Sequence, residues 1–62
     1  MSDIKMRRNG MKVFISAESV RGAVWMLENI MRPQAVSMIL DAELAEDIKE
    51  DFRSAGLEVE GP

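Results

Sequence analysis

A chain of 62 residues forms at most one small domain, and its core is marginal because a domain of this size buries only roughly 60% of the surface that it exposes when unfolded. The chain contains no cysteine and no histidine, which excludes disulfide bonds and the usual structural zinc sites. We therefore expect residues 1–62 to form a single domain without a cofactor, stabilised by oligomerisation.

The formal net charge of −3 is unevenly distributed along the chain. Residues 1–32 carry six basic and three acidic side chains, giving +3, whereas residues 33–62 carry two basic and eight acidic side chains, giving −6. This polarity can help two copies to pair or one copy to bind an oppositely charged partner, and chance produces it about as readily in so short a chain.

Neither a membrane span nor a secretion signal is indicated by the sequence. No apolar run approaches the length of a membrane-spanning helix, and the start Met1-Ser2-Asp3-Ile4-Lys5 lacks the hydrophobic stretch of a signal peptide. We therefore expect a soluble, cytoplasmic protein that does not bind membranes.

The first predicted element is a β-hairpin around Asn9-Gly10, because this dipeptide favours a two-residue type I′ turn. Its strands are Asp3 to Arg8 and Met11 to Ser16. A loop at Asn9-Gly10 pairs Met6 with Val13. The alternative is that residues 1–10 form a flexible arm before a domain that begins at Met11.

The predicted pairing gives the hairpin two different faces, because successive residues of a strand point to opposite sides. One face is apolar and carries Ile4, Met6, Val13 and Ile15. The other face is basic and carries Lys5, Arg7 and Lys12 beside Phe14.

A helix should follow from about Val20 to Met31, with Ser16 or Ser19 as its cap and Pro33 as its limit. At 100° per residue its apolar stripe consists of Val20, Ala23, Val24, Leu27, Ile30 and Met31, with Met26 at the margin. Trp25 falls outside this stripe.

The remaining elements are a strand, a helix and a short strand. Residues 35–40 are nearly all apolar, which is typical of a central or parallel strand covered on both faces. Asp41 marks the start of a helix from Ala42 to Ser54, and Gly56 ends it. Leu57 to Glu60 alternates like an edge strand. The core stripe predicted for this helix is Leu44, Ala45, Ile48, Phe52 and Ala55.

The predicted fold is therefore a small α+β domain of order ββαβαβ, with an N-terminal β-hairpin and two helices packed on a three- to four-stranded mixed sheet. If both helices cover one face of the sheet, the other face exposes Phe14 and half of residues 35–40. We expect a second copy of the chain to cover these apolar side chains.

Trp25 is the only tryptophan and lies beside Arg21 and Arg32 on the helical wheel. Tryptophan and arginine are enriched at binding hot spots, and an arginine one turn away can stack on the indole ring. We therefore predict that Trp25, Arg21, Arg32 and Phe14 bind a partner. The alternative is that Trp25 covers one end of the small core.

Two other surfaces provide alternative sites. The basic hairpin face with Lys5, Arg7 and Lys12 is compatible with nucleic-acid binding. The helix start at Ser16 and Ser19 has free N–H groups that could bind an anion, although capping explains both serines. The acidic residues of the second helix are typical of a solvated face, or of a docking surface for a basic partner.

Three short segments resemble parts of known families. Met11 to Glu18 resembles the opening strand of some metal-dependent aminopeptidases, but their metal-binding histidines have no counterpart here. Ser37 to Leu44 is similar to the strand-to-helix entry of ribbon-helix-helix repressors and antitoxins, which continue into a second helix. Ala55 to Glu60 resembles the end of the C-terminal domain of the ribosomal stalk protein. No family follows from these matches.

Catalysis has little basis in the sequence. With no histidine, cysteine or tyrosine, acid–base chemistry would fall to carboxylates or lysine, and a nucleophilic serine would lack its usual base. We therefore expect no catalytic residue and no metal site. The sequence favours a non-enzymatic, antitoxin-like regulator or inhibitor that binds another protein as a homodimer or higher homo-oligomer. The alternatives are a nucleic-acid-binding module and a small-ligand-binding oligomer.

Overall fold

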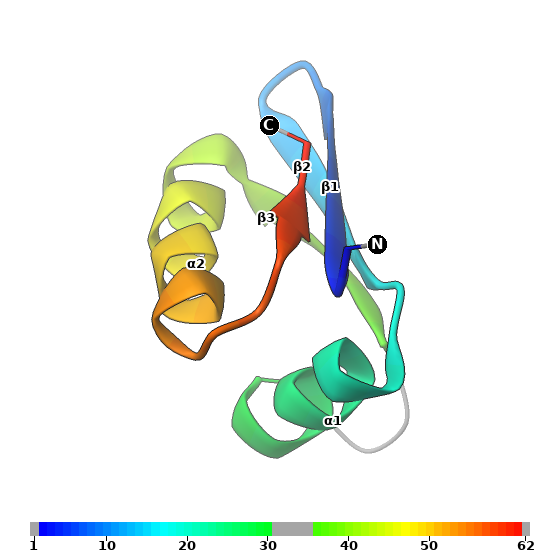
Figure 1. Cartoon of the computed structure of the whole chain (residues 1–62). Coiled ribbons are helices and arrows are strands. Elements are labelled where there is room, and N and C mark those ends of the chain that lie inside the picture. The colour runs from blue at the N-terminus through cyan, green and yellow to red at the C-terminus, as the bar shows by residue number, and fades with distance from the viewer. Residues whose placement is uncertain (1, 31–35, 62) are drawn as a thin grey trace.

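The computed structural model describes residues 2–30 and 36–61, and in them it shows two helices and a four-stranded mixed sheet, an α+β fold (Figure 1). The elements in chain order are β1 (Ile4–Asn9), β2 (Lys12–Ala17), α1 (Val20–Asn29), β3 (Ser37–Asp41), α2 (Ala42–Ser54) and β4 (Val59–Glu60). The strand order is β3-β2-β1-β4, with β1 parallel to β4 and the other pairs antiparallel. The predicted fold class is confirmed at this level.

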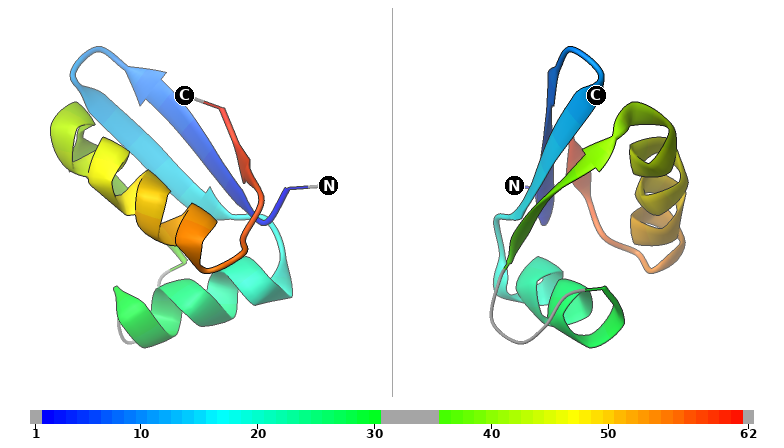
Figure 2. Two further views of the ribbon diagram at one scale, coloured as in Figure 1. Left: turned by 60° about the vertical axis from the view of Figure 1, so that its left-hand side comes forward. Right: turned by 180° about the vertical axis from the view of Figure 1, so that it is seen from behind.

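The core lies between one face of the sheet and the two helices. Figure 2 shows α2 crossing this inner face and α1 lying across the end of the sheet where β1 begins and β2 ends. The buried core residues are Ile4, Met6, Val13, Ile15, Met26, Ala45, Phe52 and Leu57. Each large apolar side chain buried in this way contributes about 1.5–3 kcal/mol relative to an exposed one.

The hairpin turn lies one residue further along than predicted. Asn9 pairs with Lys12, so that Gly10 and Met11 form the turn, and of these two residues only Gly10 has a positive φ, of 68°. Glycine with positive φ at the first central position is the pattern of a type II′ turn. Met6 therefore pairs with Ile15, and each side chain keeps its predicted face because the partner shifts by two residues.

The side of α1 that faces the core differs from the predicted stripe. Gly22 and Met26 are buried, whereas Val20 is 81% exposed and Val24 is also exposed. A Cβ atom at Gly22 would collide with the backbone carbonyl oxygen of Asp3. The missing side chain allows α1 to touch the backbone before β1, and this contact turns the Gly22 and Met26 side inward.

The strand β3 lies at an edge of the sheet, which corrects the prediction of a central or parallel strand. Among the described residues it pairs with β2 alone, in antiparallel register. Met38 and Leu40 point inward and are half-buried, while Ile39 points outward and is 56% exposed. The apolar run therefore reflects one face in the core and one face open to solvent.

The helix α2 has the bounds that the sequence predicted. Asp41 occupies the N-cap position, but in the described structure its carboxylate makes no cap hydrogen bond and instead accepts one from Lys12 Nζ at 2.6 Å. Ala45 and Phe52 face the core as expected, whereas Leu44 is exposed. The core stripe of α2 is thus narrower than predicted.

The C-terminal end of α2 has the geometry that glycine at this position predicts. Gly56 has a φ of 83°, and its N–H donates to the carbonyl oxygen of Arg53 at 3.0 Å. The N–H of Leu57 donates to the carbonyl oxygen of Phe52, also at 3.0 Å. These two bonds define a Schellman motif, which usually brings the residue after glycine against the last turn. Leu57 and Phe52 are both buried, so the motif directs the chain back into the core.

Candidate binding surface on the open face of the sheet

The strand register aligns the outward residues of β1, β2 and β3 in three rows. The central row is Arg7, Phe14 and Ile39, and the flanking rows are Lys5, Ser16, Ser37 and Asn9, Lys12, Asp41. Glu60 of β4 lies beside Lys5. We call these ten residues the open face, because α2 covers the other face of the sheet and α1 lies across its end (Figure 2).

The central row of the open face combines an aromatic, an aliphatic and a cationic side chain. Phe14 is 42% exposed and Ile39 is more exposed still, although directly opposite each other on adjacent strands. Arg7 is exposed beside Phe14. These three residues and Ser16 line a shallow hollow. An apolar centre with arginine and a polar rim is the usual composition of a protein–protein interface.

The charges of the open face largely cancel. Lys12 pairs with Asp41 at 2.6 Å, and Lys5 lies beside Glu60 in the register. Three basic residues against two acidic ones leave +1 on this face. Among the described residues, Arg7 forms no ion pair. An exposed ion pair contributes only about 0–1 kcal/mol to stability, so the pairing of Lys12 mainly reduces the positive potential of the face.

Trp25 packs against the hydrophobic core, whereas Phe14 lies on the open face of the sheet. Its ring packs edge-to-face on Phe52, with the centroids 5.1 Å apart and the planes at 67°. Such a pair contributes about 0.5–1.5 kcal/mol beyond area burial. The half-exposed remainder of Trp25 borders a shallow apolar hollow with Val20 and Val24. Arg21 lines the same hollow, whereas Phe14 lies on the open face, so Phe14 does not share a surface with Trp25 and Arg21.

The guanidinium of Arg21 is also held by contacts within the chain. Arg21 donates to the carbonyl oxygen of Gly56 at 2.5 Å and lies 3.6 Å from Asp3 Oδ2, so its guanidinium ties α1 to the turn after α2. Arg32 lies outside the described residues. The helix α1 ends at Asn29, with Ile30 as its C-cap, two residues before the predicted end at Met31.

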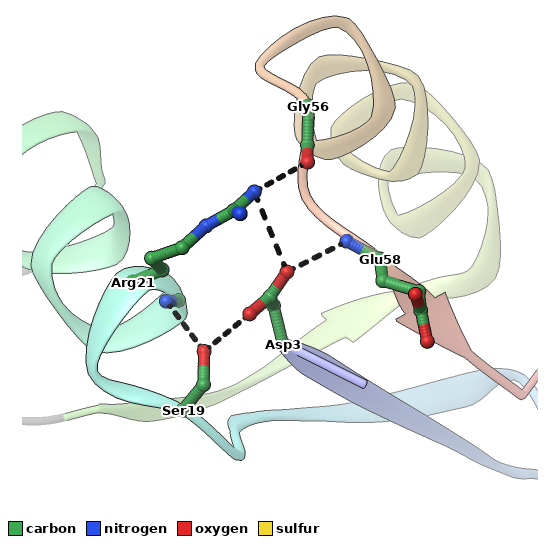
Figure 3. A network of polar contacts seen from close by, with 6 residues as sticks. Asp3, Ser19, Arg21, Gly56 and Glu58 are labelled. Atoms are coloured by element: carbon green, nitrogen blue, oxygen red, sulfur yellow. Dashed lines mark hydrogen bonds and ion pairs between the residues drawn. The ribbon is translucent and has the colours of Figure 1, made fainter. Parts of the chain in front are cut away.

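Asp3 connects three parts of the chain, as Figure 3 shows. Its carboxylate accepts hydrogen bonds from the Glu58 N–H at 3.0 Å and from Ser19 Oγ at 2.6 Å. These donors, together with the Arg21 guanidinium, lower the pKa of Asp3 below its ordinary value, with the Glu58 N–H as the largest cause. The sequence pattern did not reveal this role, because Glu58 is 55 residues away along the chain.

The helix start at Ser19 is already occupied by groups of the chain itself. Ser19 Oγ accepts from the Gly22 N–H at 3.0 Å, as a helix cap does, and donates to Asp3. Ser16 Oγ donates to Glu18 at 3.4 Å. An external anion at Ser19 would have to displace the Asp3 carboxylate, so the geometry does not favour the anion-binding alternative.

The acidic residues of α2 lie exposed on its solvent side, namely Glu43, Glu46, Asp47, Glu50 and Asp51. In residues 2–30 and 36–61, no group of three or more acidic side chains is placed to bind a metal ion. In the same residues, no helix has the length and apolar character that a membrane crossing requires.

Comparisons of the chain with protein-family models, with curated proteins and with solved structures find no match.

Proposed function

We propose that the chain is a small non-catalytic regulator or inhibitor that binds another protein through the open face and works as a homo-oligomer. The observation that carries this proposal is the central row of Arg7, Phe14 and Ile39. Two large apolar side chains remain accessible there in a domain whose core is otherwise small. Polar side chains surround them on both flanking rows, as at the rim of an interface.

The open face supports this role better than the surface around Trp25 does. Trp25 stabilises the core through Phe52, so a partner would gain only the part of the ring that is still exposed. Phe14 and Ile39 point away from the core, and a partner can bury them without rearranging the fold.

A capture experiment with matched variants tests the proposal. The tagged chain, its Phe14→Ser variant and its Val20→Ser variant are compared as baits in extract of the source cells. Both substitutions replace an exposed apolar residue, but only Phe14 lies on the open face. We expect the wild type and Val20→Ser to capture the same proteins, and Phe14→Ser to capture none of them. Equal capture by all three folded baits, verified by circular dichroism, contradicts the proposal.

Nucleic-acid binding is the second candidate, because Lys5, Arg7 and Lys12 gather beside Phe14 on this one face. The net charge of +1 there predicts a weak electrostatic contribution, since affinity rises with the number of phosphates neutralised. Titration of labelled single-stranded DNA and RNA at low salt decides between the two. Binding that falls steeply with salt and disappears in Arg7→Gln supports the second candidate. If neither nucleic acid binds, the second candidate is excluded and protein binding is the function that stands.

A further inference from the structure

The edge strand β3 lacks the features that usually protect a sheet edge. Natural edge strands are short, or carry lysine, proline or a bulge that discourages pairing with another chain. The sequence of β3 is Ser-Met-Ile-Leu-Asp, with no lysine and no proline, and its one charge is compensated by Lys12. The other edge strand, β4, has only two residues. β3 is therefore the edge that favours strand addition.

The hydrogen-bond pattern identifies which backbone groups of β3 point outward. The Ala17 N–H donates to Val36 O and the Ala42 N–H donates to Met11 O, each at 2.9 Å. Hydrogen-bonded and non-hydrogen-bonded pairs alternate along an antiparallel ladder. Residues 36, 38, 40 and 42 therefore direct their backbone groups to β2, while Ser37, Ile39 and Asp41 direct theirs away from the sheet.

We propose that two copies of the chain pair along β3 in antiparallel orientation, with Ile39 at the two-fold axis, and form one continuous sheet. The outward N–H and C=O of Ile39 then exchange two hydrogen bonds with the same groups of the second copy, which is the arrangement of a hydrogen-bonded antiparallel pair. The inference rests on the proposed homo-oligomer and names the surface that forms it.

The side chains of β3 are complementary in this register. Ile39 meets Ile39, Met38 meets Leu40 on the inner face, and Ser37 meets Asp41 on the open face, so that no like charges are adjacent. A parallel pairing in register would place the two Asp41 carboxylates side by side, and like charges directly opposite each other destabilise a sheet. The sequence of β3 therefore favours the antiparallel dimer.

The side of α2 above β3 also supports this pairing. Glu46 lines a hollow with Arg8 and Val13, so this side of α2 faces β1. Leu44 lies about 200° away around the helix and therefore faces outward beyond β3. Leu44 is exposed in the single chain and lies on the side that the second copy would approach.

Pairing at β3 also extends the candidate binding surface. The central row becomes Arg7, Phe14, Ile39 followed by the same three residues of the second copy in reverse order. Six adjacent strands at about 4.8 Å spacing give a row roughly 24 Å long. Its centre holds four apolar side chains, and an arginine stands at each end. A dimeric sheet thus presents a larger surface to a partner protein than one chain does.

Single cysteines test the geometry directly, because the natural chain has none. In the β3 pairing, Ile39→Cys brings two thiols together across a hydrogen-bonded pair, with Cα atoms about 5.5 Å apart, a separation that a disulfide spans. Phe14→Cys is the matched control on the same face. Its thiols would be separated by three strand spacings, roughly 14 Å, which no disulfide can bridge.

The two variants are oxidised under identical dilute conditions and analysed by non-reducing electrophoresis. We expect nearly complete covalent dimer for Ile39→Cys and almost none for Phe14→Cys. Cross-linking of Phe14→Cys with little dimer for Ile39→Cys would mean face-to-face packing, which overturns the β3 pairing and leaves homo-oligomerisation intact. Equal cross-linking of both variants, or of neither, overturns the pairing as well.

A charge exchange at the axis provides a second test that needs no covalent bond. Ile39→Lys and Ile39→Glu each place like charges opposite one another, so each variant alone should have the mass of a single chain by sedimentation equilibrium. An equimolar mixture should recover the doubled mass, because lysine then faces glutamate across the axis. A wild-type chain that remains monomeric at all concentrations contradicts both this inference and the proposed homo-oligomer. A mixture that stays monomeric beside a dimeric wild type contradicts the register alone.

Discussion

The inner and open faces of the same sheet differ in what their side chains do. On the inner face, Ile4 and Ile15 are fully buried in one cluster with Met26 and Phe52. On the open face, Phe14 is the neighbour of Ile15 in the same strand and remains exposed. Because adjacent residues in a strand point to opposite sides, one strand contributes both to the core and to a free surface. Substitutions on the two faces should therefore separate stability from binding.

The largest expected difference in the free energy of unfolding is between substitutions of the two phenylalanines. Phe52→Ala should lower the free energy of unfolding by about 3–5 kcal/mol, because it removes a fully buried ring and its contact with Trp25. A domain of this length has a total stability of only about 3–9 kcal/mol, so much of the population should unfold. Phe14→Ala should change stability by less than about 1 kcal/mol. Urea titration followed by circular dichroism measures both, and equal losses would contradict the division between the faces.

Substitutions at Trp25 test whether its ring stabilises the core or belongs to a binding surface. Trp25→Ala should destabilise the chain by about 2 kcal/mol, less than truncation of a fully buried aromatic residue, whereas Trp25→Phe should retain most of the contact with Phe52. Thermal unfolding of the two variants gives the comparison. If Trp25→Ala keeps its melting temperature and loses partner binding instead, Trp25 belongs to an interface, as the sequence first indicated.

Substitution of Gly22 tests whether its close approach to the Asp3 backbone orients α1. Alanine is ordinarily the better helix residue by about 1 kcal/mol, but here its Cβ atom would collide with the Asp3 backbone. We expect Gly22→Ala to destabilise the protein by about 1–2 kcal/mol net, in the range of overpacking. The exposed position Glu28→Ala serves as the control for helix propensity. A stabilised Gly22→Ala variant in urea titration would show that α1 does not depend on this approach.

The smallest change in stability should come from the substitution Asp3→Asn, and this change should depend on pH. The pKa of Asp3 is lowered in the folded state, so its stabilising contribution is present above the unfolded pKa and is lost as pH falls through the folded pKa. The wild type should be more stable than Asp3→Asn at pH 7, and the difference should shrink below about pH 4. Urea midpoints at both pH values measure this, with Glu50→Gln as a control for the loss of one exposed carboxylate. A difference that stays constant with pH would contradict the role of the carboxylate charge.

Local chemistry was sufficient to predict several features. Ser19 marked the start of α1 and Gly56 marked the end of α2, because caps and left-handed residues act on the adjacent turn alone. The alternation in the hairpin also placed Lys5, Arg7, Lys12 and Phe14 on one face, although the turn itself shifted by one residue. The candidate surface was thus largely predictable, apart from Ile39, whose place beside Phe14 depends on the pairing of β3.

Other features depend on contacts between residues that are distant in sequence. The hydrophobic stripe of α1 predicted only part of the buried side, which includes Ile30 and Met26. The close approach of Gly22 to Asp3 outweighs the apolar preference of Val20 and Val24, which stay exposed. The apolar run in β3 could not distinguish a central strand from an edge strand, since strand order is a property of the whole sheet. Asp3 gained its role only when folding brought Ser19 and Glu58 to it.

The sequence by itself determined the type and approximate limits of each element, because periodicity, caps and turn residues act over a few positions. The tertiary structure decided the orientation of α1, the edge position of β3 and the inward packing of Trp25. These outcomes follow from which surfaces meet in space, and a small core allows few arrangements in which buried backbone groups and large side chains all find partners.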